Sequence, residues 1–153
     1  STFKPYTHVT DIFIACHYWD PKSPKFISKE DYLDPDFKIT VIADVSCDVN
    51  GPIASTVRAS TIADPFYGYN PETGKDERPF ISPKNITVMA VDNLPGELPR
   101  NASSDFGKDL MDKVFPSLFG HDDAGIIERA TIAKDGKLTE RYAYLQNYIE
   151  GKE

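Results

Sequence analysis

The chain has 153 residues, about the length of one globular domain, so there is room for one sizeable hydrophobic core. Seventeen basic residues against 24 acidic ones give a formal net charge of −7, which excludes a basic surface able to neutralise nucleic-acid phosphates or anionic lipids. No apolar stretch approaches the ~20 residues that cross a bilayer, so we expect neither a nucleic-acid nor a membrane partner.

Three short apolar runs are predicted to form strands of one sheet. They contain residues 12–16, 39–45 and 86–90, and turn residues follow each run. Runs buried on both faces are typical of parallel sheets, whose strands are joined by long crossover connections. We therefore expect a Rossmann-like three-layer α/β fold with a mainly parallel sheet, and a short helical crossover over 28–33 with Ser28 as its N-cap.

The remaining segments have weaker or more local patterns. Residues 64–83 contain many Pro, Gly and Tyr residues without a sustained period, which predicts a loop. After Pro99, apolar residues recur every three or four positions and predict an amphipathic helix, which Pro116 should kink or end and Gly120 should stop. Asp135-Gly136 predicts a hairpin, followed by a last amphipathic helix that reaches Ile149.

The usual sequence motifs of catalytic and metal sites are missing. No two glycines are separated by a single residue, so neither G-x-G-x-x-G nor a phosphate loop is present. The three histidines and the two cysteines, Cys16 and Cys47, show no metal-ligand spacing, so we expect no metal site and no disulfide scaffold. Unpaired cysteines of this kind favour a reducing compartment.

Polar residues follow each of the three predicted strands. In open parallel sheets, ligands bind at the carboxyl edge, where loops and helix N-termini meet. The same residue types also cap turns and helices, and the pattern alone leaves both interpretations open and favours capping. The residues concerned are Tyr18 and Asp20, Asp44 and Asp48, and Asp92 and Asn93.

Several long strings make the chain resemble a known enzyme family. They are IACHYWD (14–20), ADVSCDVNGPI and TVRASTIADPFYGYNP (within 43–71), VMAVDNLPGELPRNASSDFG (88–107) and KDGKLTERYAYLQ in the tail. They resemble the lysine-ketoglutarate reductase part of the aminoadipic semialdehyde synthases. More loosely, the chain is similar to the fungal lysine-forming saccharopine dehydrogenases and to the alanine dehydrogenases.

This resemblance implies an enzyme with two Rossmann-like domains and a cofactor cleft between them. It makes residues 1–120 the later half of an NAD(P)-binding domain, and residues 121–153 a hairpin and helix that return toward an N-terminal domain. The family's acid-base Lys and His and its glycine-rich turn would lie upstream of Ser1, so we expect a fragment that is inactive by itself. The residue that selects NAD or NADP follows that turn by ~20 residues, so the cofactor is expected to be one of the two, bound fully only by the complete enzyme.

The resemblance also assigns roles to single positions. Apolar side chains would form a surface for the nicotinamide and its ribose, while Asp and Asn would hydrogen-bond ribose hydroxyls or the carboxamide. The residues similar to dinucleotide-lining positions are Tyr18, Val45, Val91, Asp92, Asn93 and Leu94. Asp48 resembles an active-site Asp of the alanine dehydrogenases, and the alternative is an Asp that stabilises the turn before Asn50-Gly51.

The expected function is the C-terminal portion of an NAD(P)-dependent saccharopine dehydrogenase, which reductively condenses L-lysine with 2-oxoglutarate to saccharopine. The alternatives are an alanine-dehydrogenase-like or opine-type oxidoreductase, and a non-catalytic nucleotide-binding or regulatory module. The expected partners are these small molecules and the N-terminal domain, with self-association through an exposed apolar edge. The expected location is the cytoplasm, or the mitochondrial matrix if the source is an animal.

Overall fold

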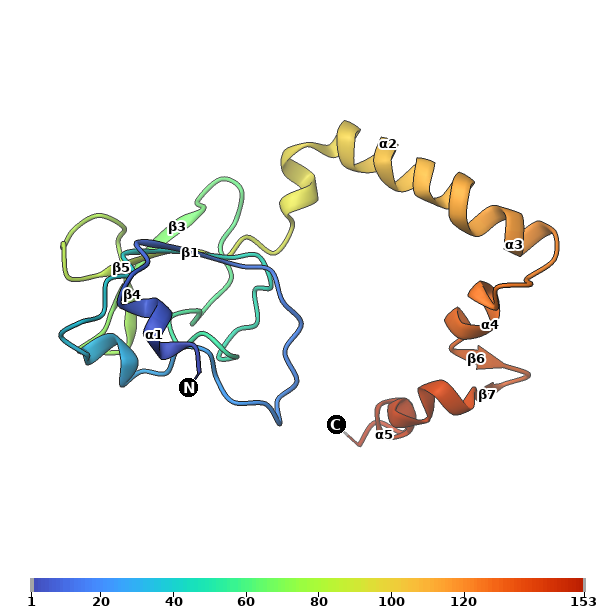
Figure 1. Ribbon diagram of the computed structural model, residues 1–153, viewed down its shortest axis with the longest axis horizontal. Helices are drawn as coiled ribbons and strands as arrows, with labels where there is room; N and C mark the ends of the chain where they lie inside the picture. Colours follow the sequence, from blue (N-terminus) through green and yellow to red (C-terminus); the bar gives the residue numbers. More distant parts are fainter. Residues whose placement is uncertain (1, 153) are drawn as a thin grey trace. The chain divides into compact units, whose positions relative to one another are not determined.

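The computed structural model describes residues 2–152, and these form two compact units, one ending at Leu98 and the other beginning at Pro99 (Figure 1). The predicted domain boundary after residue 120 concerns a complete enzyme and stays a prediction. Each unit is described by itself below.

The first unit is built on a five-stranded sheet with the strand order β1-β2-β5-β3-β4. The bounds are Ile12–Ala15 for β1, Val41–Asp44 for β2, Phe66–Asn70 for β3, Lys75–Glu77 for β4 and Ile86–Met89 for β5. Strands β1, β2 and β5 are parallel neighbours, and only β3 runs against the others. The mixed α/β class, the mostly parallel sheet and the three predicted strands are therefore confirmed.

The prediction of a loop over residues 64–83 was wrong, because this segment contains the β3–β4 hairpin. Tyr67 and Tyr69 alternate with small or exposed neighbours and are fully buried in the core. Gly74 closes the hairpin turn with a φ of 67°, a left-handed conformation that glycine adopts without steric cost. The period-two pattern of β3 is only five residues long and lies in a segment rich in Pro and Gly, so the sequence did not indicate a strand there.

One face of the sheet carries the hydrophobic core. By register, this face consists of Phe13, Ala15, Ile42, Asp44, Tyr67, Tyr69, Ile86 and Val88. It packs against the segment around α1 (Lys4–Thr7), the turn η1 (Asp31–Leu33) and the loop near Ile53, which contribute Phe3, Tyr32 and Ile53 to the same apolar cluster.

The opposite face of the sheet is more exposed. Ile12 and Ile14 of β1 are 59% and 62% exposed, and Phe66 of β3 is 41% exposed. The prediction that the first strand is buried on both faces was wrong, because Ile12 and Ile14 lie on the face of the sheet opposite the core and are exposed. An apolar surface of this kind favours the expected self-association, which sedimentation of the purified chain tests.

The crossover between β1 and β2 contains one 3-10 turn, η1, instead of a longer helix. Ser28 and Asp31 exchange two hydrogen bonds at its start. The Asp31 carboxylate accepts the Ser28 N–H at 2.8 Å, and the Ser28 hydroxyl accepts the Asp31 N–H at 3.4 Å. The N-cap of η1 is nevertheless Glu30, which makes no side-chain capping hydrogen bond, so the prediction of Ser28 as the N-cap was wrong; Ser28 stabilises the turn from two residues before the cap.

Asp34, the C-cap residue of η1, ties this turn to α1 and makes stability depend on pH. Its carboxylate lies 2.7 Å from Lys4 Nζ and 3.5 Å from His8 Nε2, and the Lys4 hydrogen bond lowers the pKa of Asp34 to about 2. The unfolded pKa is ~3.9, so the ionised form is favoured by folding. The stabilisation is present above that value and is lost as the pH falls toward 2.

We therefore expect Asp34→Asn to lower the melting temperature at pH 7, and the difference from the wild type to shrink steadily between pH 5 and pH 2. Thermal melts followed by circular dichroism over that range check this. A difference that stays constant with pH would show that the Asp34 charge is not involved.

The second unit begins with a long helical segment. It comprises α2 (Pro99–Asp109), a π-helical turn η3 (Leu110–Val114) and α3 (Phe115–Phe119). The predicted helix is confirmed: Pro116 lies in the first turn of α3, directly after the π-helical turn, and Gly120 follows its last residue.

The rest of the second unit consists of short elements. These are α4 (Ile126–Ala130), the hairpin strands β6 (Ala133–Lys134) and β7 (Lys137–Leu138), η4 (Glu140–Leu145) and α5 (Gln146–Ile149). The Asp135-Gly136 hairpin is confirmed, whereas the last helix is a 3-10 segment followed by one α-helical turn. Among residues 99–152, none is buried. Within residues 2–152, no helix combines the length and the hydropathy needed to span a membrane.

Candidate functional site

The parallel strands end side by side, so the segments that follow them leave the sheet at one edge. Ala15 is in register with Asp44, and Ala43 with Met89. The Val45 N–H then donates to the Ala15 carbonyl at 2.9 Å. This edge is the carboxyl edge at which parallel sheets bind ligands, and it brings together the loops that carry the predicted site residues.

Asp44, the last residue of β2, points into the protein and is fully buried. Its Oδ1 accepts hydrogen bonds from the Ser46 hydroxyl and, at 3.1 Å, from the Cys47 N–H. Its Oδ2 accepts the Thr56 hydroxyl at 2.7 Å. A buried carboxylate needs such partners, and here they come from two different loops. At Asp44 the loop-stabilising interpretation is therefore the correct one.

Cys47 lies at the centre of the edge. Its backbone is left-handed, with a φ of 51°, and its thiol donates to the Ala90 carbonyl at 3.2 Å. Burial, followed by the negative charges of Asp92, Asp44 and Asp48, raises the pKa of the Cys47 thiol. Asp48 and Asp92, which come from different strand ends, are thus both within electrostatic reach of one thiol.

Asp48 takes part in the turn through its main chain. Its carbonyl accepts the Gly51 N–H at 2.8 Å, and a Cβ at position 51 would lie 2.6 Å from the Asp48 Cβ, so this turn requires glycine. Within residues 2–152, the half-buried Asp48 carboxylate accepts no hydrogen bond. The carboxylate is therefore available to a ligand, and its catalytic role stays a prediction.

The segment after β5 presents two polar side chains at the surface. Asp92 and Asn93 are exposed, whereas Val91 is only 3% exposed and its N–H donates to Met89 Sδ at 3.4 Å. The Asn93 carbonyl accepts the Gly96 N–H at 3.0 Å, and Leu94 begins the 3-10 turn η2 (Leu94–Glu97). Asn93 therefore closes a turn with its main chain and keeps its side chain at the edge.

Tyr18 lies in the loop after β1 and is 92% exposed. It lines an open cavity of about 620 Å³ together with aromatic and polar neighbours, among them Trp19, Lys25 and Phe26. The Trp19 indole N–H donates to the Pro24 carbonyl at 3.2 Å, which holds the ring in place. Val45, 40% exposed, follows β2. Aromatic and aliphatic faces of this kind suit a planar ring.

Sequence reasoning missed the loop that supports this edge, residues 55–60. Ser60 pairs with the end of β5: its N–H donates to the Ala90 carbonyl at 2.8 Å, and its hydroxyl accepts the Ala90 N–H at 3.0 Å. Ser60 also forms a parallel bridge with Val91. The loop thus extends the sheet beside the segment that carries Asp92 and Asn93.

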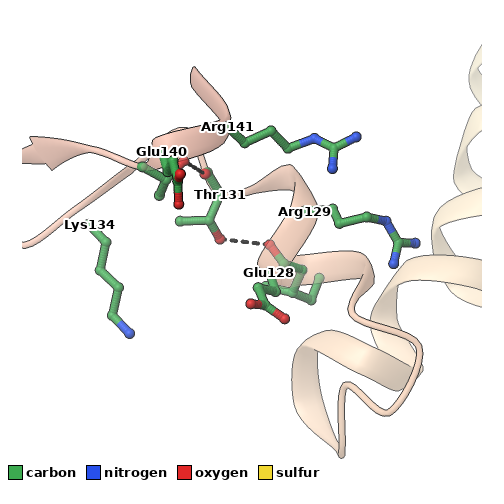
Figure 2. A pocket seen from close by; sticks show the side chains of 8 residues that line it. Glu128, Arg129, Thr131, Lys134, Glu140 and Arg141 are labelled. Atoms are coloured by element: carbon green, nitrogen blue, oxygen red, sulfur yellow. Dashed lines mark hydrogen bonds between the residues drawn. The ribbon is translucent and has the colours of Figure 1, made fainter. Parts of the chain in front are cut away.

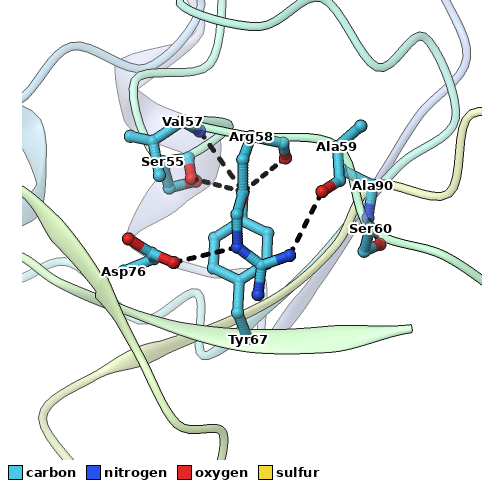
Figure 3. A network of polar contacts seen from close by, with 8 residues as sticks. All are labelled: Ser55, Val57, Arg58, Ala59, Ser60, Tyr67, Asp76 and Ala90. Atoms are coloured by element: carbon cyan, nitrogen blue, oxygen red, sulfur yellow. Dashed lines mark hydrogen bonds and ion pairs between the residues drawn. The ribbon is translucent and has the colours of Figure 1, made fainter. Parts of the chain in front are cut away.

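The same loop is anchored on the buried ring of Tyr67, as Figure 3 shows. The Tyr67 hydroxyl donates to the Ser55 carbonyl at 2.9 Å and accepts the Val57 N–H at 3.3 Å. The Arg58 guanidinium lies 4.4 Å from the ring centroid, and its Nε donates to Asp76 at 2.9 Å. The alternation of Tyr67 and Tyr69 was the only sequence signal for this anchor.

The second unit contains an open cavity of about 860 Å³. Its charged lining residues are Glu128, Arg129, Lys134, Glu140 and Arg141. Figure 2 shows the two arginines extending in the same direction, with Lys134 and Glu128 pointing elsewhere. Charges of both signs on exposed side chains bind ions weakly, so we assign no ligand to it. Among residues 2–152, no group of three His, Cys, Asp or Glu side chains is placed to hold a metal ion.

Comparison with known proteins gives consistent relatives. No protein-family model matches the chain. The chain is 32% identical over 151 residues to an alpha-aminoadipic semialdehyde synthase of Arabidopsis thaliana, an alignment that covers 93% of the chain and 14% of that protein. It is 39% identical over 102 residues to the saccharopine dehydrogenase [NAD(+), L-lysine-forming] of Candida albicans, covering 67% of the chain and 25% of that enzyme.

A mitochondrial alpha-aminoadipic semialdehyde synthase of Mus musculus is 24% identical over 161 residues, covering 89% of the chain and 17% of that protein. The chain thus spans a quarter or less of these three relatives. Most of the chain aligns with both enzyme types, and its mostly parallel sheet is consistent with a Rossmann-like fragment. The chain is therefore a homologue of one part of the lysine-forming saccharopine dehydrogenases and the alpha-aminoadipic semialdehyde synthases.

Proposed function

We propose that the chain forms part of the NAD-binding domain of an enzyme that reductively condenses L-lysine with 2-oxoglutarate to saccharopine. The observation that carries this proposal is the carboxyl edge of β1, β2 and β5, where Asp48, Asp92 and Asn93 stand at the ends of neighbouring strands. The names of the fungal relatives, which specify NAD and lysine formation, supply the reaction and favour NAD over NADP.

In this proposal, the exposed polar groups bind and orient the dinucleotide. Asp92 accepts hydrogen bonds from ribose hydroxyls or the carboxamide, and Asn93 accepts or donates them. Tyr18, Val45 and Leu94 offer apolar contact surface. Val91, which is 3% exposed, supports the segment that carries Asp92 and Asn93. When bound, the dinucleotide supplies or accepts the hydride.

Asp48 is the candidate catalytic residue. Its carboxylate has no hydrogen-bond partner among residues 2–152 and belongs to the same edge as Asp92. An ionised carboxylate there attracts the protonated amine of an amino-acid substrate and orients it toward the cofactor.

Residues 1–120 would then belong to the cofactor domain, and residues 121–153 to the segment returning toward an N-terminal domain that supplies the acid-base groups. We place the protein in the cytoplasm, or in the mitochondrial matrix if its source is an animal; the name of the mouse relative specifies a mitochondrial protein. The small-molecule partners are lysine, 2-oxoglutarate and saccharopine.

Steady-state assays test this function. The 153-residue chain should turn over neither saccharopine nor lysine with 2-oxoglutarate, because it lacks a glycine-rich phosphate turn. The complete enzyme to which we assign the chain should oxidise NADH only when lysine and 2-oxoglutarate are both present.

Oxidation of NADH with pyruvate and ammonia would instead indicate an alanine-dehydrogenase-like enzyme. If no NADH is oxidised with any of these substrates, the protein is a non-catalytic module. Clear dehydrogenase activity of the 153-residue chain would contradict its assignment as part of a site.

A further inference from the structure

We propose that Asp44 is the positioning residue of the cofactor edge: its buried carboxylate holds together the loops that present Asp48 and Asp92. The expected effect of Asp44 on cofactor affinity rests on the proposed function. Its geometry rests on the hydrogen bonds of Asp44 and on those that continue from them to Asn50 and Ala90.

The first contact fixes the loop after β2. The Cys47 N–H donates to Asp44 Oδ1 at 3.1 Å, and the Ser46 hydroxyl donates to the same oxygen. Cys47 has a φ of 51°, a conformation that a non-glycine residue keeps only where its surroundings impose it. The carboxylate supplies that constraint one residue before Asp48.

The second contact fixes the supporting loop. Thr56 donates its hydroxyl to Asp44 Oδ2 at 2.7 Å, and the Thr56 carbonyl accepts the Asn50 N–H at 2.9 Å. Asp44 therefore fixes the turn from Asp48 to Gly51 in two ways. It binds Cys47 directly before the turn, and through Thr56 it fixes Asn50 within the turn.

The third step reaches β5. The Ala90 carbonyl accepts both the Cys47 thiol, at 3.2 Å, and the Ser60 N–H, at 2.8 Å. Ala90 lies two residues before Asp92. A change at Asp44 therefore reaches Asp48 through one neighbour and Asp92 through two hydrogen bonds.

Asp44 itself cannot touch a ligand, because it is fully buried and its oxygens are occupied. The competing explanation is that Asp44 only stabilises the fold. Networks of this kind stabilise as well as position, so the test compares Asp44 with another buried hydrogen bond of the same loop that does not reach the edge. The Ser55 hydroxyl is suitable: it is fully buried and accepts the Tyr32 hydroxyl at 2.8 Å.

The experiment uses the 153-residue chain and three variants, Asp44→Asn, Thr56→Val and the control Ser55→Ala, at a temperature where all four remain folded by circular dichroism. Hydrogen exchange is measured by NMR, and the dissociation constant of NAD+ is obtained by titration. For Asp44→Asn and Thr56→Val, we expect amide exchange at 47–48 and 92–93 to accelerate roughly ten-fold or more, with unchanged exchange in β4. We expect the NAD+ dissociation constant of both to rise by about ten-fold.

The control should lose thermal stability without either local effect. If Asp44→Asn and Thr56→Val behave like Ser55→Ala, Asp44 is only a stabilising residue and the proposal is overturned. If the wild-type chain does not bind NAD+, the proposed function fails, and the exchange at 47–48 and 92–93 still decides whether Asp44 positions the edge.

Discussion

Tyr67→Ala is expected to lower the free energy of unfolding by about 3–5 kcal/mol, the range for truncating a large buried aromatic side chain. The ring is fully buried between the sheet and the loop that supports the candidate site. Its hydroxyl also satisfies the Ser55 carbonyl and the Val57 N–H, and burial raises the pKa of Tyr67 to about 12. Urea unfolding followed by circular dichroism measures the change.

A matched pair of variants separates the hydroxyl from the ring. Tyr67 and Tyr69 are neighbours on the same buried face, but within residues 2–152 the Tyr69 hydroxyl has no hydrogen-bond partner. Tyr67→Phe should therefore cost about 1–3 kcal/mol, whereas Tyr69→Phe should be near neutral or stabilising. Equal losses at the two positions would contradict the anchoring role of the Tyr67 hydroxyl.

Asp92→Ala and Asn93→Ala, made in the complete enzyme, are expected to raise the KM for the cofactor more than the KM for lysine. Each variant removes about 1–2 kcal/mol of hydrogen bonding, or roughly ten-fold in affinity, because a cofactor group is left unpaired. Kinetics with the cofactor and each substrate varied in turn measure the two constants.

Asp36→Ala is a suitable control for these kinetics. Asp36 is an exposed carboxylate that precedes the amino end of β2, at the edge opposite the candidate site. If Asp92→Ala and Asn93→Ala leave the cofactor KM unchanged and lower the melting temperature by several degrees, Asp92 and Asn93 are turn and cap residues only.

The parallel core of the sheet was predictable because β1, β2 and β5 are apolar runs with clear ends. The β3–β4 hairpin was not, because its alternation spans only Phe66 to Asn70 inside a segment rich in Pro and Gly. The inward orientation of Asp44 was readable in principle. It stands two residues after Ile42 and so shares the buried face of β2.

The candidate site was predictable only in part, as a set of positions at strand ends. The Cys47 thiol reaches the Ala90 carbonyl only because β2 and β5 are neighbours, and strand order is not encoded in any local pattern. The support from Thr56 and Ser60 could not be predicted for the same reason, since each contact joins separate segments of the chain.

The most direct test of the central claim is an NMR titration of the isotopically labelled 153-residue chain with NAD+. The account predicts binding with a dissociation constant on the order of millimolar, as for part of a cofactor site. It predicts chemical-shift changes concentrated at Tyr18, at 45–48 and at 91–94. No binding, or changes centred on the cavity between Ile127 and Arg141, would contradict the assignment of the carboxyl edge as the cofactor site.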